Sequence, residues 1–324
     1  MSSVPHRTLR ADRVGDGEGM FAPARSRPHS PSFAAWLRMA RPLVPPPSAG
    51  RVGDPGLYGR GSAAWHVGRE RVLLAAGPAA LLLQVAHPLV AAGVAGHSAF
   101  RADPFARLRG TLGAMLEVTF ADREGALAAS RRVAGTHARV RGTLAAPAGA
   151  LAAGVPYDAR DPDLALWVHL TLVHAALSAY ESFVGPLPAG ERDAYVSETR
   201  RQAELFGVEP ASVPQTHAAF AALVRETVEG PTLVVDGVAR ELAAEILHPP
   251  MPRALLPAGA LLRTVTAGLL PPRLRSAFGL AWGPPERAAF AGAAASSRAA
   301  VPALPSSARY WAHYRAALGR TATG

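Results

Sequence analysis

One long helix most constrains the fold that this chain can adopt. Asp161 and Pro162 begin it, because an aspartate side chain can cap the free amides of a first turn and proline is preset for the first helical position. Gly185 and Pro186 end it. The mainly apolar segment between them is about 23 residues long and spans ~34 Å as a helix. A helix of this length can cross a large domain, so we expect a helical protein built around it.

The chain from Tyr58 onward continues this pattern, with helical periodicity broken by proline and glycine. One hairpin signal is present, at residues 232–239, where two apolar runs flank Asp236 and Gly237. We therefore predict an all-α fold, a single large helical domain over residues 51–324 with at most a short β-hairpin. Further helices are expected at residues 66–77, 79–96, 104–120, 123–141, 189–206, 215–229, 238–247, 258–269 and 285–300.

Residues 1–50 are predicted to be a disordered leader, because Arg, Pro, Ser, Gly and acids are mixed there without periodicity. Residues 32–43 within it could form a short basic amphipathic helix, which would either pack on the main body or contact a membrane surface. The first 30 residues lack a continuous apolar segment, which argues against a secretory signal. We expect a cytoplasmic protein, with peripheral membrane contact left open.

Residues 72–100 test the membrane alternative, because they carry no formal charge over more than the ~20 residues that a transmembrane helix needs. Pro78, Pro88 and several polar side chains interrupt this segment. Proline breaks a helix by removing a backbone donor, so a pair of buried helices fits better than a stable membrane span.

Composition excludes several functions. The formal charge is +10 and all 34 basic residues are arginine, spread along the chain without a nucleic-acid-binding module. A general compositional bias explains this better than phosphate contacts, so we expect no nucleic-acid partner. Cysteine is absent, which excludes disulfides and thiolate ligands and leaves His, Asp, Glu or Tyr to hold any metal.

The most informative motif joins Arg107 and Thr111, one helical turn apart, to a later histidine, His137. Val133 and Val140 lie at helical spacing from His137, so its ring points with the apolar side chains. A neutral buried imidazole can either bind a metal or simply bond a backbone carbonyl. An inward arginine needs an anion, and either a cofactor carboxylate or an acid such as Glu117 or Asp122 could supply it.

Gln84, His87 and His97 form a second candidate group in the uncharged segment. No carboxylate lies between Glu70 and Asp103, so His87 and His97 are the catalytic candidates there for acid–base work. Gln84 is a neutral hydrogen-bonding residue that could contact a cofactor.

Two rival sites are weaker. Glu245 and His248 have the spacing used by di-iron helix bundles, but those sites need the motif twice and two further glutamates. A serine hydrolase would need a Gly-x-Ser-x-Gly turn after a strand, and the sequence has none.

Several short motifs together resemble the family of rubber oxygenases (latex-clearing proteins) and MpaB-type oxygenase catalytic domains. The resemblance spans about residues 57–320. Its motifs are Trp65, Gln84-x-Ala86-His87-Pro88-x-Val90, Gly96-His97-Ser98-x-Phe100, Asp103-Pro104, Arg107-x-x-x-Thr111, His137-x-x-Val140-x-Gly142, Asp161-Pro162-x-Leu164-x-x-Trp167-Val168-His169 and Leu270-Pro271-x-x-Leu274-Arg275-x-x-Phe278-Gly279.

This resemblance implies an all-α protein with a globin-like pocket between helices for heme b, and dioxygen as co-substrate. His137 would be the proximal iron ligand. Arg107 and Thr111 would lie near the heme edge and propionates, which supplies the anion that Arg107 needs, and Gln84 would be a further cofactor contact. Characterised members cleave carbon–carbon double bonds of isoprenoid chains.

The sequence also departs from that pattern. Gly110 replaces the lysine that can cap the distal iron position in rubber oxygenases, and residues 71–102 lack the pocket glutamate proposed as their base. Cleavage of the polymer itself is therefore not expected. We expect a heme b-dependent oxygenase of a small apolar substrate, isoprenoid or unsaturated and lipid-like, with an electron donor as a further partner. The alternative is a non-catalytic helical protein that binds heme or an apolar ligand.

Overall fold

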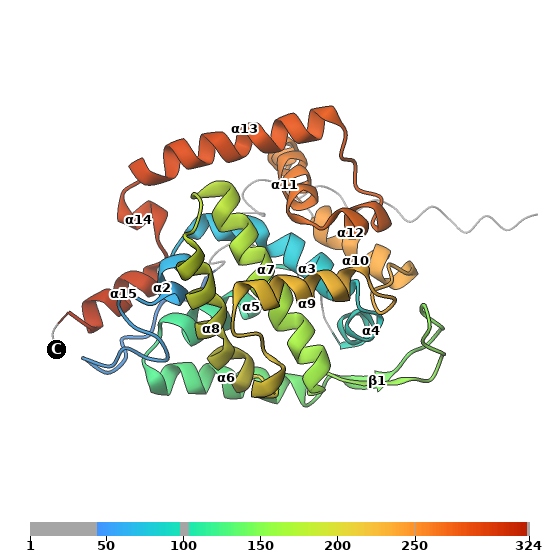
Figure 1. The fold of residues 1–324 in the computed structure, drawn as a ribbon, viewed down its shortest axis with the longest axis horizontal. Coiled ribbons are helices and arrows are strands. Elements are labelled where there is room, and N and C mark those ends of the chain that lie inside the picture. The colour runs from blue at the N-terminus through green and yellow to red at the C-terminus, as the bar shows by residue number, and fades with distance from the viewer. Residues whose placement is uncertain (1–43, 98–103, 250, 323–324) are drawn as a thin grey trace, which may run out of the picture.

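A computed structural model describes residues 44–97, 104–249 and 251–322, and within residues 104–108 it describes the backbone alone. The predicted leader helix at 32–43 lies outside these ranges. The fold is all-α with one two-stranded hairpin, as predicted (Figure 1). The α-helices are α2 (Ala63–Gly68), α3 (Gly77–Val85), α4 (Pro88–His97), α5 (Pro104–Phe120), α6 (Arg123–His137), α7 (Pro162–Phe183), α8 (Ala189–Leu205), α9 (His217–Glu229), α10 (Gly237–Leu247), α11 (Leu256–Leu269), α12 (Pro272–Ala277), α13 (Pro284–Ala300), α14 (Ser306–Arg309) and α15 (Ala312–Arg320). The 3-10 helices are η1 (Arg71–Ala76), η3 (Pro210–Ser212), η4 (Arg253–Leu255) and η5 (Val301–Ala303).

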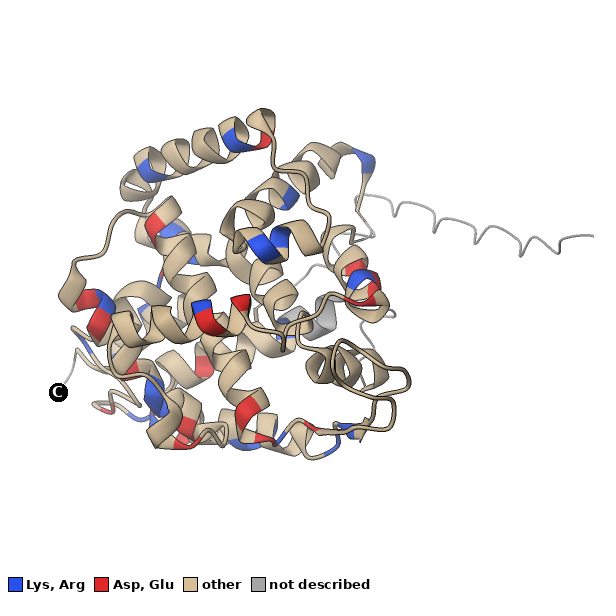
Figure 2. Ribbon diagram, turned by 45° about the vertical axis from the view of Figure 1, so that its right-hand side comes forward, with Lys and Arg blue, Asp and Glu red and all other residues tan. Residues whose placement is uncertain are grey.

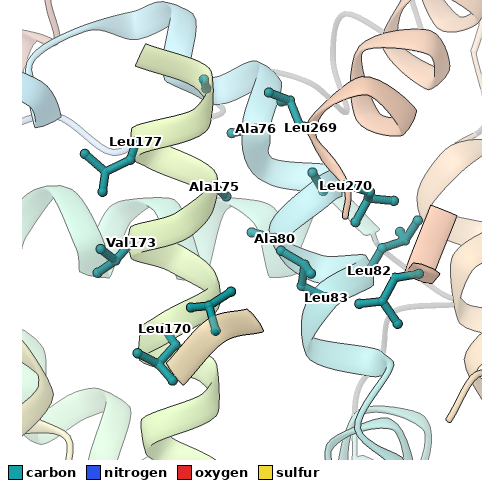
Figure 3. Packing of buried hydrophobic residues seen from close by; sticks show 14 of the residues in the cluster. Ala76, Ala80, Leu82, Leu83, Leu170, Val173, Ala175, Leu177, Leu269 and Leu270 are labelled. Atoms are coloured by element: carbon teal, nitrogen blue, oxygen red, sulfur yellow. The ribbon is translucent and has the colours of Figure 1, made fainter. Parts of the chain in front are cut away.

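Helix α7 is the central element that the sequence predicted. The Asp161 side chain accepts hydrogen bonds from the amides of Asp163, at 2.8 Å, and Leu164, and Pro162 occupies the first turn. The helix packs against η1, α3, α8 and α13. Figure 3 shows the small residues Ala80 and Ala175 where α7 approaches α3, which lets the two backbones come close.

The uncharged segment folds as three short pieces, η1, α3 and α4, instead of the two longer helices predicted at 66–77 and 79–96. Pro88 has no amide proton to continue a helix, and α3 ends at Val85. The chain bends by 109° between the helical stretches 71–85 and 88–97. Within the described ranges, no single helix is long and apolar enough to cross a bilayer, and this bent pair passes that test only when taken together.

The hairpin predicted at residues 232–239 is wrong. Asp236 instead caps helix α10, with its side chain accepting from the Ala239 amide at 2.7 Å, and Gly237 is the first helical residue. An Asp-Gly pair fits a helix start as well as a tight turn, and the helix is favoured here by the apolar face that follows. The actual hairpin pairs β1 (Arg141–Thr143) antiparallel to β2 (Pro156–Asp158). The helix expected to reach residue 141 therefore ends at His137.

A buried ion pair ties the C-terminal segment to the core. Glu70 is fully buried, and both of its carboxylate oxygens accept hydrogen bonds from the Arg309 guanidinium at 2.8–3.1 Å. The Trp311 amide donates to the Arg69 carbonyl at 3.1 Å beside it. Other charges are interspersed over the described ribbon, and arginines do not gather in one stripe in the view of Figure 2.

Candidate functional site

Helices α5 and α6 form an antiparallel pair that brings the principal motif together. Asp122 in the turn between them accepts from the amides of Gly125, at 2.9 Å, and Arg51, at 2.7 Å. Further along, Arg132 on α6 forms an ion pair with Glu117 on α5, which fixes the register. His137 follows Arg132 by five residues on α6, and residue 112 precedes Glu117 by five residues on α5. Because the helices are antiparallel and each advances by the same rise per residue, His137 lies level with residue 112.

The segment from Arg107 to Thr111 and the His137 ring therefore share one end of the α5–α6 pair. Thr111 is exposed and His137 is half-buried, so His137 is not a core histidine. The acids considered as partners for Arg107 are engaged elsewhere: Glu117 with Arg132, and Asp122 with backbone amides. The side chain of Arg107 lies outside the described atoms.

His97 belongs to the same end of the molecule. It lies at the end of α4, and its Nε2–H donates to the carbonyl oxygen of Arg141 at 3.0 Å. Arg141 follows His137 by four residues, and a bond from the Val140 amide to the His137 carbonyl, at 2.9 Å, makes that connection a tight turn. Tyr157 on β2 adds its hydroxyl at 3.2 Å from the same nitrogen.

His87 and Gln84 lie at the other end of α4, so the structure separates the two histidines considered for acid–base work. Both residues are buried, at 9% and 6% exposure. Helix α4 has 10 residues, which places His87 and His97 about 15 Å apart along it. Burial lowers the pKa of His87, although the nearby Asp161 carboxylate acts in the opposite direction. Its Nδ1 has no hydrogen-bond partner among the described residues.

Comparison with known proteins identifies the family. Residues 64–299 match the family described as the ER-bound oxygenase mpaB/B'/rubber oxygenase, catalytic domain. The chain belongs to this family. Its predicted site residues all lie within the matched span, and the resemblance drawn from the sequence motifs is confirmed.

Two curated relatives of this oxygenase domain are the uncharacterized proteins Mb2261 of Mycobacterium bovis and Rv2237 of Mycobacterium tuberculosis. Each is 29% identical over 191 residues, which cover 58% of this chain and 71% of the relative. No solved structure matches the chain.

The donor set of the oxygenase domain suits heme better than a directly chelated ion. Among the described residues, no group of three or more His, Asp or Glu side chains could hold a metal. Heme brings four nitrogen ligands of its own and needs one protein histidine, which His137 can provide. The rival pair Glu245 and His248 gains no further acidic partner for a metal in the described parts of the chain.

A cavity of about 460 Å³ lies elsewhere in the domain, between α8 and the segment that leads into α2. Tyr58, Ser62 and Arg201 are among the residues that line it, and no predicted site residue with a described side chain does. The candidate site is therefore the end of the α5–α6 pair, where Thr111, His137 and His97 lie on neighbouring segments. Tyr157 and the Arg141 carbonyl belong to this group but were not predicted from the sequence.

Proposed function

We propose that this oxygenase domain uses heme b and dioxygen, and that His137 would be the residue that holds the iron. The observation that carries the proposal is the antiparallel α5–α6 pair, which brings a half-buried histidine level with a segment that carries an arginine and a threonine. With Glu117 and Asp122 engaged elsewhere, a heme propionate is the anion that suits Arg107. When bound, heme would supply an iron with an open position for dioxygen.

Gly110 leaves space next to Thr111 for a cofactor or substrate. A β-carbon built at this position meets no heavy atom of the described residues within 4 Å. The lysine that can occupy the corresponding place in rubber oxygenases is absent. Thr111, exposed beside it, can donate a hydrogen bond to a cofactor or to bound substrate.

We further propose that the substrate is a small apolar molecule, isoprenoid or unsaturated and lipid-like. Helix α4 leads to the candidate site and carries no carboxylate or guanidinium, and Val94 on it packs against a buried apolar cluster that includes Ala91 of the same helix. Such a surface favours hydrocarbon over charged ligands, because a charged group would lose its hydration without gaining a partner. The described residues around it would orient the chain of the substrate and exclude water.

An absorption spectrum of the purified protein, with and without added hemin, tests the cofactor. We expect a Soret band that is shifted or lost in His137→Ala. His248→Ala is the matched control, because this histidine is exposed on another part of the fold. A protein without a Soret band after hemin addition, or with the same band in His137→Ala, would overturn the assignment.

Oxygen consumption by the reduced, heme-loaded protein with short isoprenoids and unsaturated lipids tests the activity. Turnover that depends on an unsaturated substrate supports the oxygenase. Heme binding without turnover on any of these substrates would favour the non-catalytic heme-binding alternative.

A further inference from the structure

Tyr157 sits in a recess formed by three glycines. Gly93 and Gly96 lie one turn apart on α4, and Gly142 lies opposite Tyr157 in the hairpin. A β-carbon at Gly96 would come 3.1 Å from the Tyr157 hydroxyl oxygen, and one at Gly142 would come 2.7 Å from it. The phenol therefore reaches His97 only because these positions have no side chain.

This recess holds the imidazole of His97 from two sides. The rings of His97 and Tyr157 meet edge to face, with centroids 6.0 Å apart at 79°. The Nε2 atom of His97 faces both the Arg141 carbonyl oxygen and the Tyr157 hydroxyl. The hairpin strand that carries Arg141 continues directly from the helix that ends at His137. Tyr157 thus links the position of His97 to that of the proposed iron ligand.

The contacts also decide where the ring proton lies. A carbonyl oxygen can only accept a hydrogen bond, so Nε2 must carry the proton that it donates to Arg141. In the neutral ring the lone pair is then on Nδ1. Since the His97 side chain is exposed, a proton received at Nδ1 can pass on to water.

We propose that Tyr157 is a positioning residue that fixes His97 with Nδ1 as its proton-accepting atom, and that His97 handles protons in this oxygenase in place of His87. The proposal rests on the heme site proposed above. When a substrate bond to hydrogen breaks, the proton forms a new bond to Nδ1 and the electron pair stays on the substrate. His87 is unsuited to this exchange, because it is buried at the far end of α4.

Nitrogen-15 NMR of the full chain, with labelled histidine, tests the fixed ring without requiring heme. The spectrum is recorded above about pH 8, where unperturbed imidazoles are neutral, and the His97 signals are assigned by their loss in His97→Gln. We expect the Nε2–H form alone in the wild type. Gly142→Ala should give both neutral forms, because its new methyl group displaces the phenol that holds the imidazole against the Arg141 carbonyl. Adding Tyr157→Phe to Gly142→Ala removes the shortest of the new contacts, 2.7 Å to the hydroxyl oxygen. It should restore only part of the Nε2–H population, because a ring carbon still lies 2.9 Å from the methyl.

Oxygen consumption by the heme-loaded variants tests the role in turnover. Tyr157→Phe should lower kcat about 2- to 10-fold, the effect of losing one hydrogen bond, with KM unchanged. Arg160→Gln is the matched control, because it disrupts the exposed Arg160–Asp158 pair in the same hairpin without touching His97. It should leave kcat as in the wild type.

Two results would overturn the inference: a wild type in which His97 populates both neutral forms, or an active wild type whose kcat is unaffected by Tyr157→Phe. Failure of the proposed function is recognised separately, by the absence of a Soret band from the wild type. The NMR comparison of wild type and Gly142→Ala still decides in that case whether Tyr157 fixes the ring.

Discussion

Replacing Arg309 by methionine should destabilise the whole domain, although Arg309 lies beyond the span that matches the family. Methionine keeps an unbranched apolar side chain but removes the guanidinium, whose Cζ lies over the Tyr310 ring, 5.0 Å from the centroid. Glu70, fully buried, would lose three charge-assisted contacts of 2.8–3.1 Å and keep only Arg69, at 3.5 Å. Removing one partner of a buried pair typically costs about 3–5 kcal/mol, because the other charge stays desolvated.

This loss can be converted to a thermal shift. At about 2.1 cal/mol/K per residue, the unfolding entropy for 324 residues is roughly 0.7 kcal/mol/K, so the expected fall in Tm is about 4–7 °C. Equilibrium unfolding in urea, followed by circular dichroism and tryptophan fluorescence, measures the free energy directly. The matched control is Arg192→Met, which breaks the pair with Glu181. Both of those side chains are about one-third exposed, so the expected cost is about 0–1 kcal/mol.

A second substitution tests whether the lost stability comes from the unpaired charge of Glu70. Glu70→Gln added to Arg309→Met removes the uncompensated charge, so the double variant should be more stable than Arg309→Met alone. The reasoning fails if Arg309→Met costs no more than Arg192→Met. It fails equally if the two substitutions lower the free energy of unfolding additively.

Three further predictions concern packing, pH and the cofactor. Gly268→Ala on α11 should lower the free energy of unfolding in urea by about 1–3 kcal/mol, because the new methyl meets the Phe290 ring. Gly292→Ala on α13, whose methyl meets no described atom within 4 Å, should raise it by about 0.5–1 kcal/mol. Equal effects of the two substitutions would refute the packing argument. Burial lowers the pKa of His169 to about 4, so as pH falls below about 6.5 the unfolded chain binds a proton at this residue before the folded chain does. The free energy of unfolding should therefore drop by roughly 2 kcal/mol between pH 7 and 5. Urea unfolding of His169→Gln should lack this part of the pH dependence, and an unchanged pH slope would contradict the prediction. Arg107→Gln should weaken heme binding about 10- to 100-fold in hemin titrations without moving the Soret band, and unaltered affinity would exclude the propionate role.

Helix positions were predictable where the chain itself supplies the terminating chemistry. Asp161 with Pro162 and Gly185 with Pro186 bracket α7, whose bounds follow the prediction closely. The break before Pro88 was less accurately predicted, because apolar residues on both sides of it hide the short ends of α3 and α4. Apolar residues satisfy both one long helix and two bent ones, and only tertiary packing decides between them.

The hairpin shows the opposite situation. Strands β1 and β2 have three residues each, too few for an alternating pattern to be detected. Their pairing depends on the contact of Tyr157 with α4, more than 60 positions earlier in the chain. The Asp236-Gly237 pair carried the stronger local signal and serves as a helix cap instead.

The candidate site was predictable in part. Arg107, Thr111 and His137 were selected from the sequence, and the antiparallel α5–α6 pair supplies the physical reason for their spacing. Nothing in the sequence distinguished His97 from His87, because both lie in one uncharged segment. The structure separates them by placing one at each end of α4. Tyr157 carries no motif, so its role depends entirely on the glycines that surround it.

The stability of the fold and the candidate site depend on different residues, so a substitution can affect one without the other. Glu70 and Arg309 connect η1 to the C-terminal segment, and their mutual hydrogen bonds involve no proposed cofactor residue. His137 and Thr111 lie at the open end of a two-helix pair that Glu117 and Asp122 already hold in register. Substituting Arg309 should therefore lower the free energy of unfolding while the heme spectrum of the folded protein is kept. Substituting His137 should change that spectrum with little effect on unfolding of the heme-free protein, because its half-buried ring is not part of the core.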